Sequence, residues 1–367
     1  MKPIGLYIHV PFCEQKCPYC DFYSVKSTVD VLDTYTDVVC EAIKTYVQSE
    51  NILFDTVYFG GGTPSLLGSE RLIKIMNVIK IHSVIPCEVT LEINPASLSK
   101  LDFLKLKKVG FNRLSIGLQT ALDDELKLLG RQHSAKDAAN TIKLARQSGF
   151  SNISLDLIIA IPDQTIDSLK RSIDFCINQD IQHISAYLLK VEEGTQFYKN
   201  KLSLNLKTED EEAEMYLFLV SELKKSGFNQ YEISNFAKKG YTGKHNLKYW
   251  QAQEYLGIGP SAHSFVNGKR FFYPRSIKDF LSGNIKAIDD GVGGTIDEYL
   301  MLNLRLCEGL NNSKFKSRFG FNLPEIYFKR AKQFQKYGLT FVDNENIRLT
   351  PKGFLISNEL ISKMLLS

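Results

Sequence analysis

Three cysteines lie within eight residues near the amino terminus. Cys13, Cys17 and Cys20 follow the spacing Cys-x3-Cys-x2-Cys, which lets one loop wrap three thiolates around one metal centre. Three ligands leave one position open, and an open iron in a cubane iron–sulfur cluster can bind a substrate. Two alternatives stay open at this point: a zinc site completed by His9 or Asp21, and three ordinary thiols.

The remaining cysteines do not extend this pattern. The chain holds seven cysteines, an odd number, and has no second Cys-x2-Cys pair. A thiol cluster in a reducing compartment is typical of metal or redox chemistry and not of a disulfide framework. Cys40 and Cys176 fall on apolar faces of predicted helices, where we expect them to be part of the core.

Length and charge exclude several classes of protein. At 367 residues the chain suits two domains or one large α/β barrel, at roughly 150 residues per domain. The formal net charge is only +4, so we expect no nucleic-acid partner. No apolar stretch reaches the roughly 18 residues of a membrane span, and the run 4–12 contains Pro11, unlike a signal peptide. We therefore predict a cytoplasmic protein.

Alternating apolar residues predict six strands, with amphipathic helices between them. The predicted strands are 5–10, 56–60, 88–93, 113–117, 154–158 and 183–188, and the helices include 70–80, 101–109, 135–147 and 168–179. Six βα units in succession indicate a parallel sheet, which we expect to form a partial (β/α)6 TIM-like barrel with one side open. Active sites of such sheets lie at the carboxyl ends of the strands, where the cysteine cluster also falls.

The alternation ends after about residue 195. A helical stretch at 208–226 leads into an aromatic region at 231–272, and an alternating hairpin follows at 339–350. We predict a barrel with a substrate-binding extension over 1–290. Residues 291–367 are predicted to form a small C-terminal α+β domain of the winged-helix-like type.

Several segments together resemble a known family. They are 7–13 running into Cys17 and Cys20, then 60–64, 92–95, 112–119, 156–158 and 161–165. In this order they resemble the radical S-adenosylmethionine (radical SAM) superfamily, specifically the oxygen-independent coproporphyrinogen III oxidase group, over nearly the whole chain. The resemblance implies that Cys13, Cys17 and Cys20 hold a 4Fe-4S cluster. It implies that S-adenosylmethionine is bound by Tyr7, Gly61, Gly62, Thr63, Glu92, Gln119, Arg131 and Asp156.

These residue types suit such a ligand. Glycines at 60–62 let backbone approach a ligand closely. Glu92 and Asp156 can accept hydrogen bonds from an ammonium or ribose hydroxyls, and Arg131 can pair with a carboxylate. Each also has a structural alternative, such as a plain turn or a paired surface charge. Ala160 stands where the family usually has glycine, a departure that we expect to matter little because alanine is small.

Two features separate the branches of the family. The oxidases carry a further cysteine two residues after the third cluster cysteine, and here that position is Phe22. The segment 245–250 resembles the His-Asn-x-x-Tyr-Trp heme-binding motif of the heme chaperone (HemW) branch, which implies that His245, Tyr249 and Trp250 bind heme. The structural alternative is a turn with a hydrogen-bonded histidine and a packed tryptophan. His263 is a second candidate ligand, whereas His9 and His133 could equally be structural.

The resemblance thus implies a heme chaperone that binds heme and passes it to an acceptor protein. The alternative is the oxidase itself, which decarboxylates propionates to vinyl groups; a third is a zinc-stabilised structural module. A flavodoxin or ferredoxin would donate electrons if S-adenosylmethionine is cleaved. A homodimer and peripheral contact with a membrane are further candidate interactions. The sequence assigns no catalytic residue.

Overall fold

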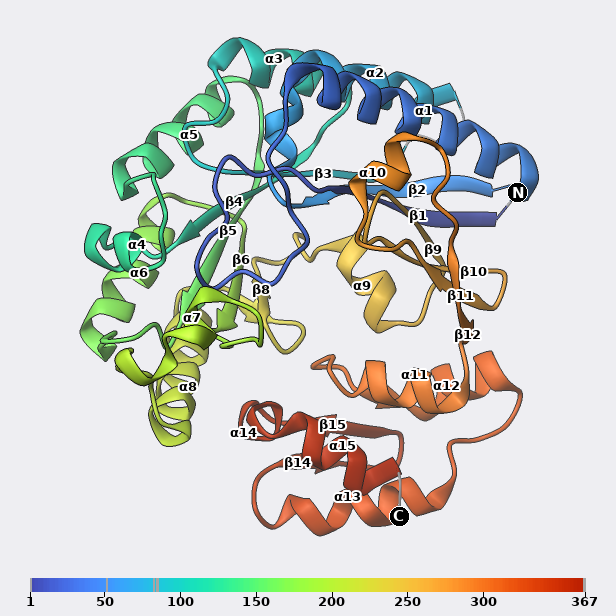
Figure 1. The fold of residues 1–367 in the computed structure, drawn as a ribbon. Helices are drawn as coiled ribbons and strands as arrows, with labels where there is room; N and C mark the ends of the chain where they lie inside the picture. Colours follow the sequence, from blue (N-terminus) through green and yellow to red (C-terminus); the bar gives the residue numbers. More distant parts are fainter. Residues whose placement is uncertain (1, 51, 82, 84–85, 366–367) are drawn as a thin grey trace.

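The computed structural model describes residues 2–50, 52–81, 83 and 86–365. Its central feature is a curved sheet in which six strands run parallel in sequence order (Figure 1). They are β1 (Lys2–Val10), β2 (Ile52–Gly61), β3 (Glu88–Ile93), β4 (Arg113–Gln119), β5 (Asn152–Ile159) and β6 (His183–Leu188). The predicted partial barrel is confirmed, and all six predicted strands are present.

Helices cover the outer face of this sheet (Figure 1). They are α1 (Val29–Glu50), α2 (Gly68–Ile81), α3 (Lys100–Lys108), α4 (Asp123–Leu128), α5 (Ala135–Gln147), α6 (Ile166–Asn178) and α8 (Glu209–Lys225). Local sequence sets where several begin: Ser99 and Ser134, for example, each form a reciprocal capping box with an aspartate three residues later. Ile4, Leu6, Ile8 and Val10 of β1 are buried in the core, together with Cys40 and Cys176, as predicted.

The sheet continues beyond the six units at both ends, which the sequence did not predict. Beside β1 lie β9 (Tyr255–Ile258), parallel to it, and then β10 (His263–Val266), β11 (Lys269–Phe272) and β12 (Ile288–Val292). Beside β6 lie β8 (Asn235–Ala237) and β7 (Asn229–Gln230). These strands have two to five residues, too few for a reliable alternation signal.

A short helix, α9 (Lys244–Trp250), packs against the amino-terminal side of the barrel. Glu88, the first residue of β3, accepts hydrogen bonds from the backbone N–H groups of Lys244 and His245, both at 2.9 Å. Lys248 pairs with Asp55 of β2 at 2.8 Å. The helix is therefore attached to the ends of β2 and β3 opposite the cysteine loop. Smaller elements are η1 (Pro64–Leu67), α7 (Gln196–Lys199), η2 (Lys201–Ser203) and α10 (Ile277–Leu281).

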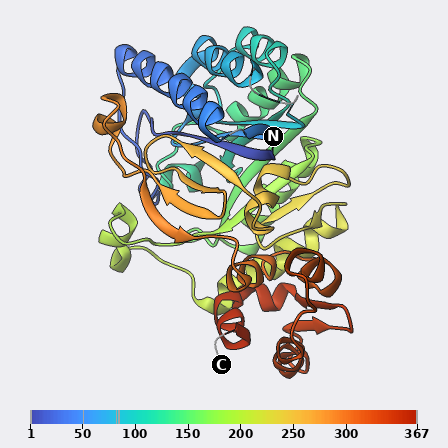
Figure 2. The same cartoon turned by 90° about the vertical axis from the view of Figure 1, so that its right-hand side faces the viewer.

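The C-terminal part forms a separate layer below the barrel (Figure 2). It contains α11 (Ile296–Asn303), β13 (Leu310–Asn311), α12 (Asn312–Phe319), α13 (Glu325–Gln335), β14 (Thr340–Val342), β15 (Asn346–Leu349), α14 (Pro351–Leu355) and α15 (Ser357–Leu365). Strands β14 and β15 are the predicted hairpin, in a three-stranded sheet with β13. Among the helices described, none is long and apolar enough to cross a lipid bilayer.

Candidate functional site

The face of the sheet that points into the barrel lumen is polar. Cross-strand register places Tyr58 beside Thr90, Thr90 beside Arg113, and Glu92 beside Ser115. Large branched apolar residues fill the interior of an ordinary barrel of this type. Here largely polar side chains line a cavity of about 900 Å3, near the upper end of the range for small-molecule sites, roughly 300–1,000 Å3. The lumen therefore has the size and polarity of a binding site.

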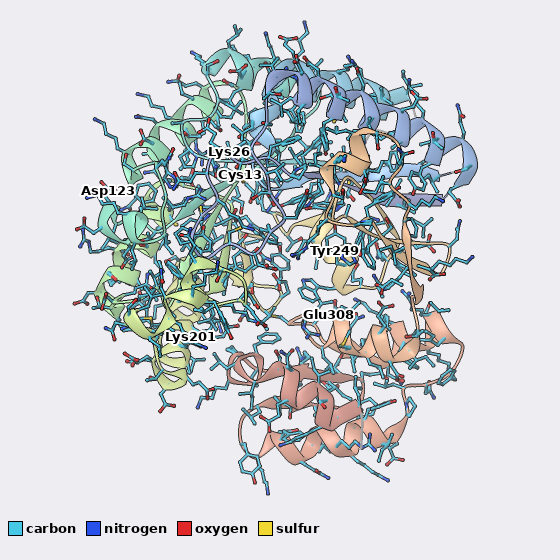
Figure 3. All side chains as sticks on the ribbon, viewed as in Figure 1. Cys13, Lys26, Asp123, Lys201, Tyr249 and Glu308 are labelled. Atoms are coloured by element: carbon cyan, nitrogen blue, oxygen red, sulfur yellow. The ribbon has the colours of Figure 1, made fainter. Side chains whose placement is uncertain are left out.

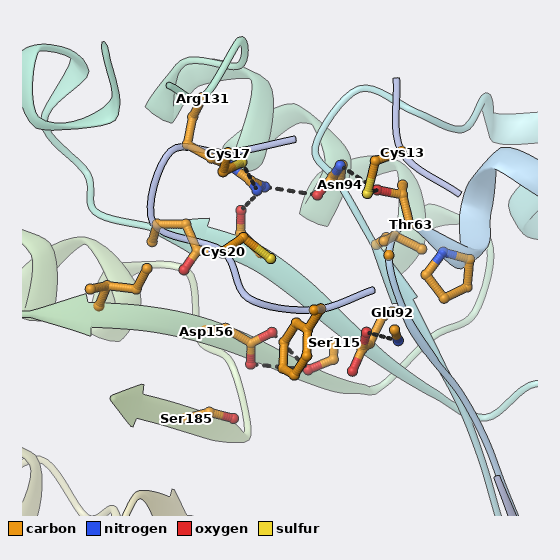
Figure 4. A pocket seen from close by; sticks show the side chains of 18 of the residues that line it. Cys13, Cys17, Cys20, Thr63, Glu92, Asn94, Ser115, Arg131, Asp156 and Ser185 are labelled. Atoms are coloured by element: carbon orange, nitrogen blue, oxygen red, sulfur yellow. Dashed lines mark hydrogen bonds between the residues drawn. The ribbon is translucent and has the colours of Figure 1, made fainter. Parts of the chain in front are cut away.

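The loop after β1 carries the three cysteines to the carboxyl-end mouth of this cavity (Figure 4). All three thiols are unpaired and half-buried, and the Cys13 Sγ lies 3.6 Å from the Thr63 hydroxyl. Burial raises the pKa of the Cys20 thiol. Three thiols from one loop that face one cavity fit an iron–sulfur cluster with an open position.

The two side chains that would complete a zinc site are engaged elsewhere. His9 is buried, and its ring joins the Tyr7 hydroxyl at 3.0 Å and the Tyr23 carbonyl at 3.3 Å. Asp21 forms an ion pair with Arg275 at 3.4 Å. In this structure neither side chain is therefore free to serve as the fourth ligand of a zinc site in this loop.

Arg131 connects the cysteine loop to the strand ends (Figure 4). One guanidinium nitrogen lies 3.6 Å from the Cys17 Sγ, and the other donates to the Asn94 side chain at 2.7 Å and to the Gly117 carbonyl at 3.2 Å. A Cβ on Gly117 would lie 3.2 Å from Arg131 and 3.0 Å from Gln119. Glycine in β4 therefore leaves the space that both side chains need. Gln119 has a φ of +70°, where β4 loses its regular register with β5.

The glycine run after β2 packs closely against the protein's own first strand and loop. Gly61 has a φ of +113°, and a Cβ there would lie 2.7 Å from the His9 ring. A Cβ on Gly62 would lie 2.6 Å from the Phe12 carbonyl oxygen. Both glycines also line the cavity. The need for glycine is thus already set by protein packing, before any ligand is considered.

Two carboxylates of the lumen are desolvated but hydrogen-bonded. Glu92 accepts from the Tyr58 hydroxyl at 2.7 Å and from the Gly61 N–H at 3.2 Å, and burial raises its pKa to about 7. Asp156 accepts from the Ser115 hydroxyl at 3.1 Å, and burial raises its pKa too. Carboxyl groups in this state can accept from a ligand's ammonium or hydroxyl groups.

His245, the first residue of the motif at 245–250, is fully buried and faces the lumen side of α9. Its Nδ1 is hydrogen-bonded to the Thr56 hydroxyl at 2.9 Å and its Nε2 to the Tyr249 hydroxyl at 2.8 Å. The ring stacks on Tyr58 with centroids 5.4 Å apart, and burial lowers its pKa to about 3. Gly5 leaves space for this ring, because a Cβ there would lie 3.1 Å from it. Both imidazole nitrogens therefore have partners within the protein.

The other two motif residues point to different places. Tyr249 lines the cavity from α9, on the side opposite the cysteine loop that carries Cys13 (Figure 3). Trp250 does not line the cavity; the Arg305 guanidinium lies 5.9 Å from its ring, and its indole N–H is buried without a partner among the described residues. The structure thus brings His245 and Tyr249 together and places Trp250 toward the C-terminal part.

The remaining histidine candidates lie apart from the cavity floor. His263 is exposed and stacks on Phe272, with centroids 5.0 Å apart. His133 lines the mouth of the cavity, and its Nε2 is hydrogen-bonded to the Leu118 carbonyl at 3.2 Å. His133 is therefore fixed to β4, whereas His263 has an accessible ring.

We expected the change from glycine to Ala160 to matter little because alanine is small, and this reason was wrong. Ala160 has a φ of +61°, in the left-handed region that disfavours every L-residue, so conformation matters here and not side-chain size. Its N–H donates to the buried Gln164 side chain at 2.8 Å, which holds this turn in place.

Sequence reasoning missed several polar residues that surround the site. Asn94 donates to Thr63 at 3.1 Å and accepts from Arg131, while Tyr58, Ser115 and Arg113 all line the cavity. A signal was available, because Tyr58, Arg113 and Ser115 occupy inward-facing positions of strands that were predicted correctly, and Asn94 directly follows another. Polar residues at such positions indicate a lumen that can bind a ligand and not a core packed with apolar side chains.

Comparison with known proteins gives the family. The family model described as the radical SAM superfamily matches residues 7–176, and the one described as the HemN C-terminal domain matches residues 295–356. The heme chaperone HemW of Bacillus subtilis is 36% identical over 98% of both chains. The heme chaperone HemW of Lactococcus lactis is 32% identical over 100% of this chain and 98% of its own.

A solved structure agrees on the fold. Coproporphyrinogen III oxidase (HemN) from Escherichia coli, a radical SAM enzyme, superposes with a TM-score of 0.82 over 99% of this chain and 90% of that chain, at 20% identity. At that identity the likeness is one of fold. The two full-length relatives carry the assignment further: the chain belongs to the heme chaperone HemW family of the radical SAM superfamily.

Proposed function

We propose that this protein binds heme and transfers it to acceptor proteins, on a barrel that also holds a 4Fe-4S cluster and S-adenosylmethionine. The observation that carries this proposal is the likeness over nearly the full chain to proteins named heme chaperone HemW. The motif at 245–250 supports it, since Tyr249 and His245 line the same cavity as the cysteine loop.

The residues of the cavity mouth suit the two cofactors that the superfamily implies. Cys13, Cys17 and Cys20 would hold the cluster, whose chemistry is electron transfer to S-adenosylmethionine. We assign the S-adenosylmethionine site to Glu92 and Arg131, together with Tyr7, Gly61, Gly62, Thr63, Gln119 and Asp156. All eight line the cavity. Their role is to orient the ligand through hydrogen bonds and to keep its charged groups paired.

Heme ligation by His245 requires a local rearrangement. Its Nε2 is bonded to the Tyr249 hydroxyl, and its Nδ1 to Thr56. We propose that Tyr249 releases the Nε2 when heme binds, while Thr56 continues to orient the ring, as a partner of a metal-bound imidazole commonly does. Burial keeps the ring neutral, which is the protonation state that a ligand needs.

The experiment is a heme titration of three proteins, followed by absorbance, with iron–sulfur content measured in each. His245→Ala should lose heme affinity and keep its cluster, because the cluster is held by the opposite end of the barrel. Tyr249→Phe keeps the aromatic ring and removes the hydroxyl, so it should bind heme at least as tightly as the wild type. Equal heme binding by wild type and His245→Ala would refute this ligand.

Other interactions follow from the same proposal. An acceptor protein takes the heme, and a flavodoxin or ferredoxin supplies electrons if S-adenosylmethionine is cleaved. A homodimer and membrane contact are proposals of the same kind, tested by solution mass and vesicle co-sedimentation. We also propose a division into a barrel with its extension and a C-terminal domain; the predicted boundary at 290/291 falls inside β12, so the division belongs after that strand.

A further inference from the structure

Three neighbouring strands place buried, unpartnered polar atoms in one cross-strand row, and Arg113 of that row lines the cavity. Thr90 of β3 is in register with Arg113 of β4, which is in register with Asn152 of β5. The Thr90 Oγ1, the Arg113 Nε and the Asn152 Oδ1 all lack a hydrogen-bond partner among the described residues. Buried polar groups are normally hydrogen-bonded, so a contiguous row of orphans indicates a missing partner.

Arg113 is the charged member of this row. Its side chain is 4% exposed, and the part of the chain that the structure describes offers its guanidinium neither a hydrogen bond nor an ion pair. Glu88 is the strongest charged influence upon it, but that carboxylate accepts from the backbone N–H groups of Lys244 and His245 at the start of α9. Burial opposes this charge, but the attraction of Glu88 and Asp156 keeps the pKa of Arg113 above its usual value. Its N–H donors nonetheless lack acceptors among the described residues, which leaves them available to a ligand.

The surroundings of Arg113 select a monoanion. Arg113 lines the cavity with Tyr58 and Tyr231, whose rings offer apolar walls. The carboxylates nearby, Glu92 and Asp156, already have protein donors, so the guanidinium is the group left free. A dianion such as phosphate would be repelled by these acidic groups more than a carboxylate would, and a guanidinium binds carboxylates through paired N–H donors.

We propose that Arg113 binds a propionate carboxylate of the tetrapyrrole, at the amino-terminal half of the barrel lumen. This inference rests on the proposed function, because the ligand class comes from it. The residues of the heme-binding motif that face inward, His245 and Tyr249, line the same cavity as Arg113. A heme ligated there would place its carboxylates in the same cavity as the Arg113 guanidinium.

The test compares heme with heme dimethyl ester, in which both carboxylates are blocked. Each is titrated into wild type, Arg113→Met, and a matched control, Arg171→Gln, at an exposed position of α6. Wild type and control should bind heme at least about tenfold more tightly than the ester, as expected for one charge-assisted hydrogen-bonded pair. Arg113→Met should bind both alike, because methionine offers no donor.

Three results would overturn the inference. Wild type with equal affinity for heme and ester has no carboxylate anchor, and an Arg113→Met variant that still prefers heme has its anchor elsewhere. A large drop in melting temperature for Arg113→Met would show that Arg113 is a structural ion, since removal of an unpartnered charge should leave stability close to wild type. Wild type that binds neither heme nor ester instead refutes the proposed function.

Discussion

Glu92 should make the affinity for S-adenosylmethionine depend on pH near neutrality. Its carboxyl lines the cavity, accepts from Tyr58 and Gly61, and has a pKa raised to about 7, chiefly by burial. A raised pKa means that the carboxyl is protonated below that pH and ionised above it. Only the ionised form accepts hydrogen bonds with both oxygens, so a ligand ammonium should bind more tightly as pH rises through 7.

The size of the effect follows from the ionised fraction. With a pKa of about 7, roughly a tenth of the protein is ionised at pH 6 and about nine tenths at pH 8. An apparent dissociation constant scales inversely with the fraction in the binding-competent state. The affinity for S-adenosylmethionine should therefore rise by roughly tenfold between pH 6 and pH 8.

The assay is equilibrium dialysis of S-adenosylmethionine against the cluster-reconstituted protein under anaerobic conditions, at several pH values. Glu92→Gln has no titratable group at this position. Any pH dependence of its affinity for S-adenosylmethionine therefore reports the ligand's own amino group. Tyr58→Phe removes a donor that stabilises the carboxylate, so its midpoint should move to higher pH. Wild type and Glu92→Gln with the same pH profile would refute the reasoning.

Three further predictions concern the cluster and the stability of the fold. Cys17→Ala should lose its iron in elemental analysis, whereas Cys87→Ala, at an exposed cysteine, should retain it; full retention in Cys17→Ala would refute the ligand assignment. Ala160→Gly should raise the free energy of unfolding in urea by about 1 kcal/mol or less, because glycine relieves the left-handed backbone but gains entropy when unfolded; a loss of stability would contradict this. Glu232 is fully buried and burial raises its pKa to about 7, so its contribution to stability is present below pH 4.5 and lost as pH rises through 7, by about 3 kcal/mol at most. Glu232→Gln should flatten that pH dependence in thermal unfolding, and an unchanged slope would assign it to another group.

The sequence predicts the barrel well because its signals are local. Apolar alternation and capping residues such as Ser134 and Thr165 specify six strands and the helices that follow them. Strands β9 and β1 pair over only four residues each, and the paired residues lie about 250 positions apart in the sequence. No local sequence pattern encodes this pairing. The short edge strands escape prediction for the same reason.

The candidate site likewise contains residues whose positions follow from local sequence and residues whose positions depend on long-range packing. Cys13 and Thr63 come soon after strand ends and Glu92 is the second-last residue of β3, so topology alone brings them to one edge of the sheet. The positions of His245 and Trp250 depend on the rotation of α9, which is set by contacts with Glu88 of β3 and Asp55 of β2. These long-range contacts bury the His245 imidazole, with both of its nitrogens hydrogen-bonded, and direct the Trp250 indole away from the cavity.

The most direct test of the central claim offers the anaerobic, cluster-reconstituted protein equimolar heme and coproporphyrinogen III, with reductant and S-adenosylmethionine. Gel filtration separates the protein fraction, and mass spectrometry then identifies the tetrapyrroles bound to it and free. The account predicts heme eluting with the protein and coproporphyrinogen III with all its carboxyl groups. Loss of two carboxyl groups, or heme eluting free of the protein, would contradict it.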